Sequence, residues 1–196
     1  MLANILNNVP LMGGPNEIVE IEESYFRGRR KPAGNGAGRM FLGNLVGPAR
    51  RNYGAVVDGP WIFGLVQKRQ DNKLDHRFFQ VMGHDANTLN LIIQRNVAPG
   101  TMIRSDKWAA YNGLGALNYI HKMVNHSLFF VDPVTRINTQ QIETSWGAAK
   151  MIIMWKMGGT SHNLLLGHMA EFWWRGLNKD NAFNVILNEL PQNYPI

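Results

Sequence analysis

Residues 18–22 read Ile18-Val19-Glu20-Ile21-Glu22, an alternation of apolar and acidic side chains. Because neighbouring residues of a strand point to opposite faces of a sheet, this period of two predicts a β-strand. Val19 and Ile21 are expected on one face, and Glu20 and Glu22 on the other. The strand should continue to Phe26. A turn cluster at 13–16 precedes it, so residues 1–16 are interpreted as a lead-in to the domain.

The residues that follow predict further strands and a helix. Two apolar runs at 61–66 and 77–81 are joined by a turn at 71–73, which is the pattern of a β-hairpin. Asp85 is a good N-cap for a helix with Leu89, Ile92 and Ile93 on one face, and that helix ends before Pro99-Gly100. A strand is expected to lead into Asp106, followed by a short helix at 107–112 and a strand at 119–124.

Helices dominate the last third of the chain. The first is expected from about Thr139 to Met157, with Asn138 or Thr139 as its cap, and two more lie near 165–172 and 183–190. This order of elements predicts an α/β fold, a mixed β-sheet flanked by α-helices, with residues 191–196 as a tail. Four of its six tryptophans are expected in the core, with base stacking as the alternative: Trp108, Trp146, Trp173 and Trp174.

Composition limits the class of protein. The 196 residues suit one domain, and 45% hydrophobic residues exclude wholesale disorder. Lys+Arg is 20 against Asp+Glu 14, and the net charge of +6 favours an anionic partner without distinguishing DNA, RNA or acidic lipid. The absence of cysteine excludes disulfides, a cysteine nucleophile and cysteine-ligated zinc. No apolar run is long enough to span a bilayer, so we expect a soluble, intracellular protein without a membrane partner.

Glycine and arginine are frequent in residues 27–57, which we interpret as a mobile loop or an insertion. Arg29, Arg30, Arg50 and Arg51 are candidate DNA-phosphate contacts, which would be salt-sensitive and without sequence specificity. A solvated loop is the alternative interpretation.

Three acidic residues suggest a metal site. Glu22 lies in the first strand, Asp106 ends a later strand, and Glu143 lies near the start of the helix that follows. Carboxylates about 4 Å apart repel by roughly 4 kcal/mol at an effective dielectric of 20, which protonation or a cation relieves. Mg²⁺ prefers such hard oxygen ligands. On the helix of Glu143, Gly147 is expected to leave room for a close backbone approach, and Lys150 is a candidate phosphate contact.

Each acid also has a simpler explanation. A glutamate in the first turns of a helix is commonly solvated and favours the helix dipole, an aspartate after a strand is commonly a helix N-cap, and a glutamate on a half-exposed strand is commonly solvated. Spacing alone leaves these alternatives open.

Longer blocks of sequence add a resemblance. They are Gly13-Gly14-Pro15 leading to Ile18-Val19-Glu20-Ile21-Glu22-Glu23-Ser24; Asp58-Gly59-Pro60-Trp61-Ile62-Phe63-Gly64; Ile92-Ile93-Gln94-Arg95 with Val97-Ala98-Pro99-Gly100; Ser105-Asp106-Lys107-Trp108-Ala109-Ala110-Tyr111; Val124-Asn125-His126-Ser127; Phe130-Val131-Asp132-Pro133; and Thr139-Gln140-Gln141-Ile142-Glu143-Thr144-Ser145-Trp146. In this order they resemble the Merlin-type DDE transposases and related bacterial insertion-sequence transposases, over nearly the whole chain outside residues 27–57.

The resemblance implies a ribonuclease H-like catalytic domain at residues 17–190, with Glu22, Asp106 and Glu143 at the metal-binding acidic positions. It implies Mg²⁺- or Mn²⁺-dependent DNA strand cleavage and strand transfer with two ions, in which water and then a DNA 3′-hydroxyl attacks a phosphodiester. His126 becomes a candidate DNA contact, with a structural hydrogen-bonding role as the alternative. DNA is the implied partner, in a homo-oligomer when active, in the nucleus of a eukaryote or the cytoplasm or nucleoid of a bacterium.

One departure bears on activity, because the family has Asp where this chain has Glu22. The extra methylene shifts the carboxylate, Mg²⁺ tolerates poor geometry badly, and a misplacement of about 1 Å can cost on the order of 100-fold in rate. The sequence therefore predicts a transposase-type enzyme of reduced activity. The alternatives are a catalytically inactive, domesticated DNA-binding or protein-interaction module, and a metal-dependent nuclease unrelated to transposition.

Overall fold

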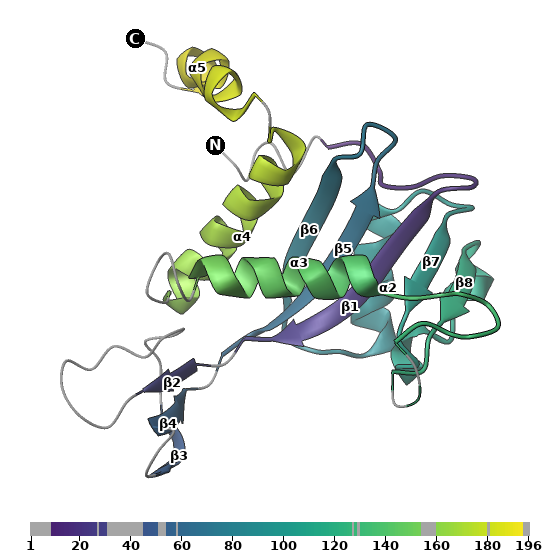
Figure 1. The fold of residues 1–196 in the computed structure, drawn as a ribbon, viewed down its shortest axis with the longest axis horizontal. Coiled ribbons are helices and arrows are strands. Elements are labelled where there is room, and N and C mark those ends of the chain that lie inside the picture. Colours follow the sequence, from purple (N-terminus) through teal and green to yellow (C-terminus); the bar gives the residue numbers. More distant parts are fainter. Residues whose placement is uncertain are drawn as a thin grey trace.

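A five-stranded mixed sheet lies at the centre of the computed structural model, in the order β6-β5-β1-β7-β8 (Figure 1). The structure describes residues 9–26, 28–30, 45–50, 54–57, 59–126, 128, 130–153, 160–179 and 181–193, and only the backbone of 28–30, 45–50, 54–57, 162 and 189–193. The strands are β1 (Ile18–Tyr25), β5 (Trp61–Lys68), β6 (Leu74–Val81), β7 (Met102–Ser105) and β8 (Ile120–Met123). Pairs β1–β5 and β5–β6 are antiparallel, whereas β1–β7 and β7–β8 are parallel.

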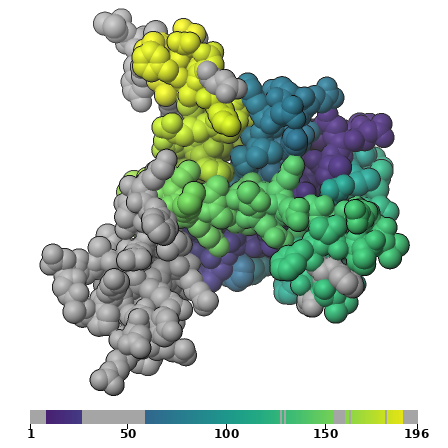
Figure 2. Space-filling model, viewed as in Figure 1, coloured from purple at the N-terminus to yellow at the C-terminus, as the bar shows by residue number. Residues whose placement is uncertain are grey.

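Helices cover both faces of this sheet, as Figure 1 shows, so the predicted α/β layering is confirmed. Helix α2 (Ala86–Asn96) lies behind the sheet, and α3 (Gln140–Met151) crosses the front face over β1 and β5. Helix α4 (His162–Leu177) packs against β6, and α5 (Ala182–Asn193) extends beyond it. In the space-filling view α3 forms a green band across this face between α4 and the segment that leads into α3 (Figure 2).

The alternation predicted for β1 separates two hydrophobic cores. On the α2 side, Val19 and Ile21 are fully buried with Phe63, Leu65 and Ile93. On the α3 and α4 side the buried cluster comprises Phe26, Ile62, Val66, Ile142, Trp146, Ala149, Ile153, Leu165 and Met169. The predicted period of two for the strand is therefore confirmed. Burying both faces explains why Glu20 and Glu22 need partners rather than water.

Gly64 on β5 allows α3 to approach the sheet closely. A Cβ at this position would lie 2.5 Å from Cζ2 of Trp146 and 2.9 Å from Cδ1 of Ile142, both on α3. Contacts this short do not occur between real side chains, so only glycine fits beneath these two residues. The absence of a side chain at Gly64 thus sets the height of α3 above β1 and β5.

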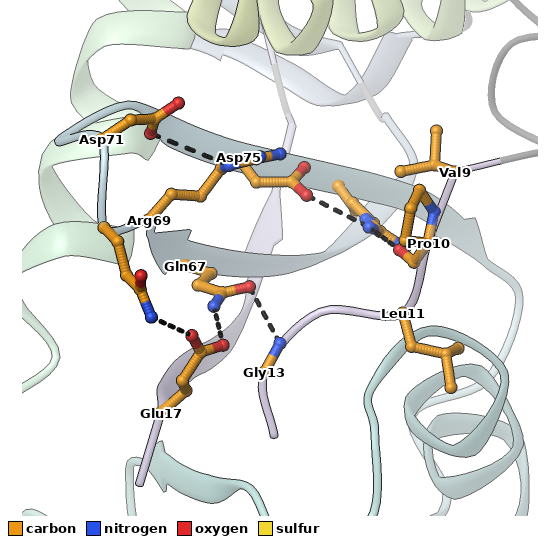
Figure 3. A pocket seen from close by; sticks show the side chains of 11 residues that line it. Val9, Pro10, Leu11, Gly13, Glu17, Gln67, Arg69, Asp71 and Asp75 are labelled. Atoms are coloured by element: carbon orange, nitrogen blue, oxygen red, sulfur yellow. Dashed lines mark hydrogen bonds and ion pairs between the residues drawn. The ribbon is translucent and has the colours of Figure 1, made fainter. Parts of the chain in front are cut away.

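A polar network anchors the N-terminal segment to the hairpin, at the end of the sheet where β1 begins. Arg77 pairs with Asp75 at 3.1 Å and donates to the carbonyl oxygen of Pro10 at 2.5 Å. Gln67 accepts a hydrogen bond from the N–H of Gly13 at 2.9 Å. These residues line a cavity of about 350 Å³ (Figure 3). Since both members of the ion pair are buried and paired, we interpret the network as structural.

Most predicted elements are found close to their expected positions. The hairpin, both later strands and the α2 N-cap are confirmed, the last by a 3.1 Å bond from the N–H of Thr88 to the Asp85 carboxylate. The expected helix at 107–112 is reduced to a 3₁₀ turn, Ala109–Tyr111. The reason is that the Asp106 side chain accepts the N–H of Trp108 at 3.0 Å, which turns the chain before a helix can start. A second 3₁₀ segment spans Leu114–Leu117.

Two other segments differ from the expectation. Within residues 27–57, interpreted as a loop or insertion, the structure describes a three-stranded antiparallel sheet of β2 (Gly28–Arg30), β4 (Gly54–Val57) and β3 (Leu45–Arg50). The valines of β3 and β4 favour strands even in a glycine-rich context. Helix α5 continues through residues 191–193, which were expected in the tail. The expected end of the helix near Met157 lies outside the described residues.

Candidate catalytic site

Glu22 lies on β1, and Asp106 directly follows the neighbouring strand β7. The parallel register of β1 and β7 ends with Glu20 opposite Arg104. Glu22 is two residues beyond this last pair on β1, and Asp106 is two residues beyond it on the other strand, directly after Ser105. Alternate residues of a strand share a face, so Glu22 lies on the same face as Glu20, beneath α3. Two of the three predicted acids therefore follow the same stretch of paired strands.

The third acid, Glu143, is placed by a hydrogen-bonded cap between β1 and α3. Glu20 is 3% exposed, and its Oε2 accepts the backbone N–H groups of Gln141 at 2.9 Å and Ile142 at 3.0 Å. These donors are in the first turn of α3, where N–H groups lack partners within the helix and a negative charge is favourable. Because Ile142 directly precedes Glu143, this cap fixes the helix acid relative to the strand that carries Glu22.

The expected cap position of this helix is confirmed at Thr139, but the capping bonds come from elsewhere. Thr139 occupies the N-cap position, but its side chain makes no capping bond. Asn138 accepts the N–H of Gln140 at only 3.3 Å. The carboxylate of Glu20 satisfies the next two N–H groups instead, from a strand far away in sequence. A local pattern of cap residues cannot reveal such a partner.

The electrostatics of Glu22 link the three acids. Burial, followed by the negative charges of Glu143 and Asp106, raises the pKa of the Glu22 carboxyl from 4.5 to about 7. Lys150 opposes this shift with its positive charge. Burial lowers the pKa of Lys150 in turn, and the charge of Glu22 raises it. Glu22 is thus within electrostatic range of both other acids, and the arrangement favours either a proton or a cation beside it.

Glu143 has other contacts in this arrangement. Its Oε1 accepts a bond from the hydroxyl of Thr139 at 3.2 Å and lies 3.4 Å from Nε2 of His126, which in turn lies 2.7 Å from the Thr139 hydroxyl. These contacts of His126 favour its alternative prediction, a structural hydrogen-bonding role.

The donor chemistry of the three carboxyls fits a hard divalent cation. Their geometry is not converged, because among the described residues no three histidine, aspartate or glutamate side chains are grouped closely enough to hold a metal ion.

The basic residues predicted to contact DNA lie in two places. Lys150 is on α3, where its ammonium group donates to the Ser24 hydroxyl at 2.6 Å and lies 5.0 Å from the ring centre of Phe26. Arg29, Arg30 and Arg50 are on the small sheet. Only the backbones of Arg29, Arg30 and Arg50 are described, and Arg51 lies outside the described residues.

Two predictions for residues near the site were wrong. Trp108 was expected in the core with the other tryptophans, yet it is 50% exposed, whereas Trp146, Trp173 and Trp174 are buried. The turn made by Asp106 leaves Trp108 at the surface, where its indole N–H donates to the carbonyl oxygen of His84 at 3.3 Å. The expected close approach at Gly147 is also absent, since a Cβ there would meet no described atom within 4 Å.

A fourth acid near the site was not singled out from the sequence. Glu23 points to the opposite face of β1 from Glu22, and its Oε2 accepts a hydrogen bond from the hydroxyl of Tyr111. Burial raises the pKa of Glu23, the Tyr111 hydrogen bond lowers it, and the charge of Asp106 raises it. Glu23 could have been identified from the sequence by the run of acids at 20, 22 and 23. A strand with both faces covered has no solvated side for such residues.

Comparison with known families agrees with this geometry. Residues 12–176 match the family model described as an ISXO2-like transposase domain. No protein with a curated description matches the chain. The mixed sheet flanked by helices is consistent with a ribonuclease H-like transposase domain. No helix within the described residues is both long and apolar enough to cross a membrane. Because the match covers most of the chain, the protein belongs to the family of insertion-sequence transposases with an ISXO2-like domain, whose function is in DNA transposition.

Proposed function

We propose that this domain cleaves DNA strands and joins them to a target, with divalent metal ions held by Glu22, Asp106 and Glu143. The observation that supports this most is the electrostatic effect of the other two acids on Glu22, because after burial the charges of Glu143 and Asp106 raise its pKa. Mg²⁺ or Mn²⁺, as a pair of ions, would supply Lewis-acid activation of the attacking hydroxyl and neutralise charge on the leaving oxygen.

The chain's own residues would orient the site. Glu20 holds the first turn of α3 over β1, so the distance between Glu22 and Glu143 is set by the cap rather than by a loop. The N–H of Trp108 holds one oxygen of Asp106. Lys150 places a positive charge near Glu22 on the face where a DNA phosphate would approach, and the arginines of residues 28–51 would add contacts to the DNA backbone.

A nicking assay on supercoiled plasmid tests this proposal. We expect slow nicking that requires Mg²⁺ or Mn²⁺ and is lost in Asp106→Asn. Glu22→Asp should raise the rate, because the shorter side chain restores the geometry of the family at this position. If no metal-dependent product forms with either the wild-type chain or Glu22→Asp, the proposed catalysis is excluded.

A second candidate function is a DNA-binding module without catalysis. It is favoured by Glu22 in place of Asp and by the contacts that Glu143 makes with Thr139 and His126. Such a module would bind DNA in a salt-dependent way, with Glu143→Ala leaving the affinity unchanged. Salt-dependent binding without any cleavage, in the wild-type chain and in Glu22→Asp, would select this function over the first.

We make three further proposals. The first is that the chain is of the Merlin type among these transposases, and the second is that it is a homo-oligomer when active. The third is that it acts where its DNA lies, in a nucleus or in the cytoplasm or nucleoid of a bacterium. The ordered sequence blocks from residue 13 to residue 146 support the first point. A tree of catalytic domains that places the chain outside the Merlin-type group would contradict it. Light scattering of the chain bound to transposon-end DNA tests the second, since a single copy per DNA end pair would exclude an oligomer.

A further inference from the structure

A small cavity with aromatic walls adjoins Asp106 on the face of the sheet opposite α3. It has a volume of about 310 Å³ and is lined by Glu23, Trp61, His84, Asp106 and Trp108. Ligand cavities in proteins start at about this size, so it suits one small planar group rather than a helix or a strand. The cavity reaches Asp106 from the side that Glu22 does not occupy.

The aromatic side chains of this cavity are exposed rather than packed in the core. Trp61 is 36% exposed and Trp108 is 50% exposed. The ring of His84 lies edge-on to Trp61 with centroids 4.3 Å apart, and the indole N–H of Trp108 donates to the carbonyl oxygen of His84 at 3.3 Å. These contacts hold both indoles in place while leaving part of their surface open, which is the form of a preorganised stacking surface.

The charges of the cavity select what can enter it. Glu23 and Asp106 line it, and none of its lining residues is lysine or arginine. A phosphate group would be repelled by the two carboxyls, whereas a neutral aromatic ring can stack on tryptophan, and amino groups on its edge would be attracted by acidic neighbours. A DNA base has these properties, and its phosphate would remain outside, on the side of Asp106 that faces Glu22.

We propose that this cavity receives one unpaired base of the DNA substrate, stacked on Trp108 beside Asp106. The inference rests on the proposed function, because Asp106 is its link to the cleavage site. The backbone N–H of Trp108 donates to Oδ1 of Asp106 at 3.0 Å, so the stacking residue and the acid belong to one tight turn. A base held in the cavity fixes the position of its own phosphate relative to Asp106. Base extrusion of this kind lets an enzyme select distorted or unpaired sites.

Fluorescence anisotropy with two labelled duplexes tests the inference. One duplex carries a single unpaired adenine, and the other carries an abasic site at the same position. Measurements in Ca²⁺ keep binding separate from cleavage. The wild-type chain should bind the duplex with the unpaired base about tenfold more tightly. Trp108→Ala should lose this preference, and Trp108→Phe should retain most of it because the ring still stacks.

Phe183→Ala serves as the matched control, because Phe183 is 73% exposed and does not line the cavity. It should keep the full preference. The inference is overturned if the wild-type chain binds both duplexes equally, or if Trp108→Ala retains the preference. Equal binding together with metal-dependent nicking would reject the base site and leave the proposed function intact. A base preference without any nicking would support the base site and reject the proposed cleavage. No binding to either duplex would reject the base site and the proposed function together.

Discussion

The carboxylate of Glu20 accepts the backbone N–H of Ile142 at 3.0 Å, joining β1 to the first turn of α3. Glu20 is two residues before Glu22 on β1, and Ile142 is one residue before Glu143 on α3. We expect Glu20→Ala to lower the free energy of unfolding by about 1–3 kcal/mol, because two N–H groups of α3 would lose their acceptor. Urea denaturation measures the change. Glu171→Ala, which removes an exposed pair with Arg175 on α4, should cost no more than about 0.5 kcal/mol. Equal effects of the two variants would show that the cap does not stabilise the fold.

A pair of glycine substitutions tests how α3 is seated. Gly64→Ala should destabilise the fold by about 1–3 kcal/mol, since its Cβ would lie 2.5 Å from the Trp146 ring. Gly147→Ala on α3 meets nothing within 4 Å and should stabilise the helix by up to about 1 kcal/mol. Thermal unfolding followed by circular dichroism distinguishes the two. A neutral Gly64→Ala would mean that α3 does not lie as close to β5 as described.

The raised pKa of Glu22 predicts how stability depends on pH. Its carboxyl keeps a proton up to about pH 7 in the folded state, whereas the unfolded chain loses it near 4.5. The folded state therefore binds more protons in this window, and its stability falls as pH rises from about 4.5 to about 7. We therefore compare the free energies of unfolding of Glu22→Gln and the wild type by urea denaturation. The difference between them should favour the variant more at pH 8 than at pH 4.

His76 does not confound this comparison. Burial lowers the pKa of His76 to about 4, which makes stability rise with pH between about 4 and 6.5, but it does so in both proteins. A difference between wild type and Glu22→Gln that does not change with pH would show that the pKa of Glu22 is the same in the folded and unfolded states.

The buried pair of Asp75 and Arg77 should be a strong determinant of stability. Asp75→Ala would leave the Arg77 guanidinium, with 5% of its side chain exposed, without a counter-charge, and would remove the acceptor of the Trp173 indole N–H. We expect a loss of about 3–5 kcal/mol. The double variant Asp75→Ala/Arg77→Met should recover part of this loss, because no buried charge remains. If the double variant is no more stable than Asp75→Ala, the unpaired charge is not the cause.

The fold was predictable from the sequence where local patterns are strong. The alternation of Val19 and Ile21 with the acids gave β1, and the apolar spacing of α2 with its Asp85 cap gave that helix. The short turn at Ala109–Tyr111 was not predictable as such, because the side chain of Asp106 competes with helix formation there.

The candidate site was predictable only in part. Glu22, Asp106 and Glu143 were proposed from their positions and from the family resemblance, and the charges of the other two raise the pKa of Glu22. The role of Glu20 was missed because its partners, Gln141 and Ile142, are more than a hundred residues away. The exposed position of Trp108 was missed for the same kind of reason, since helical spacing predicts a core residue and the turn that exposes it depends on tertiary geometry.

The most direct test of the central claim is whether Asp106 and Glu143 act as one unit in DNA cleavage. Nicking of supercoiled plasmid in Mn²⁺ would be compared for Asp106→Asn, Glu143→Gln and the double variant. Both single variants should lose most of the activity. Because removing either member of a shared metal site already abolishes its function, the double variant should nick no more slowly than the slower single variant. Multiplicative losses in the double variant, or a Glu143→Gln chain as active as the wild type, would contradict a single site built from Glu22, Asp106 and Glu143.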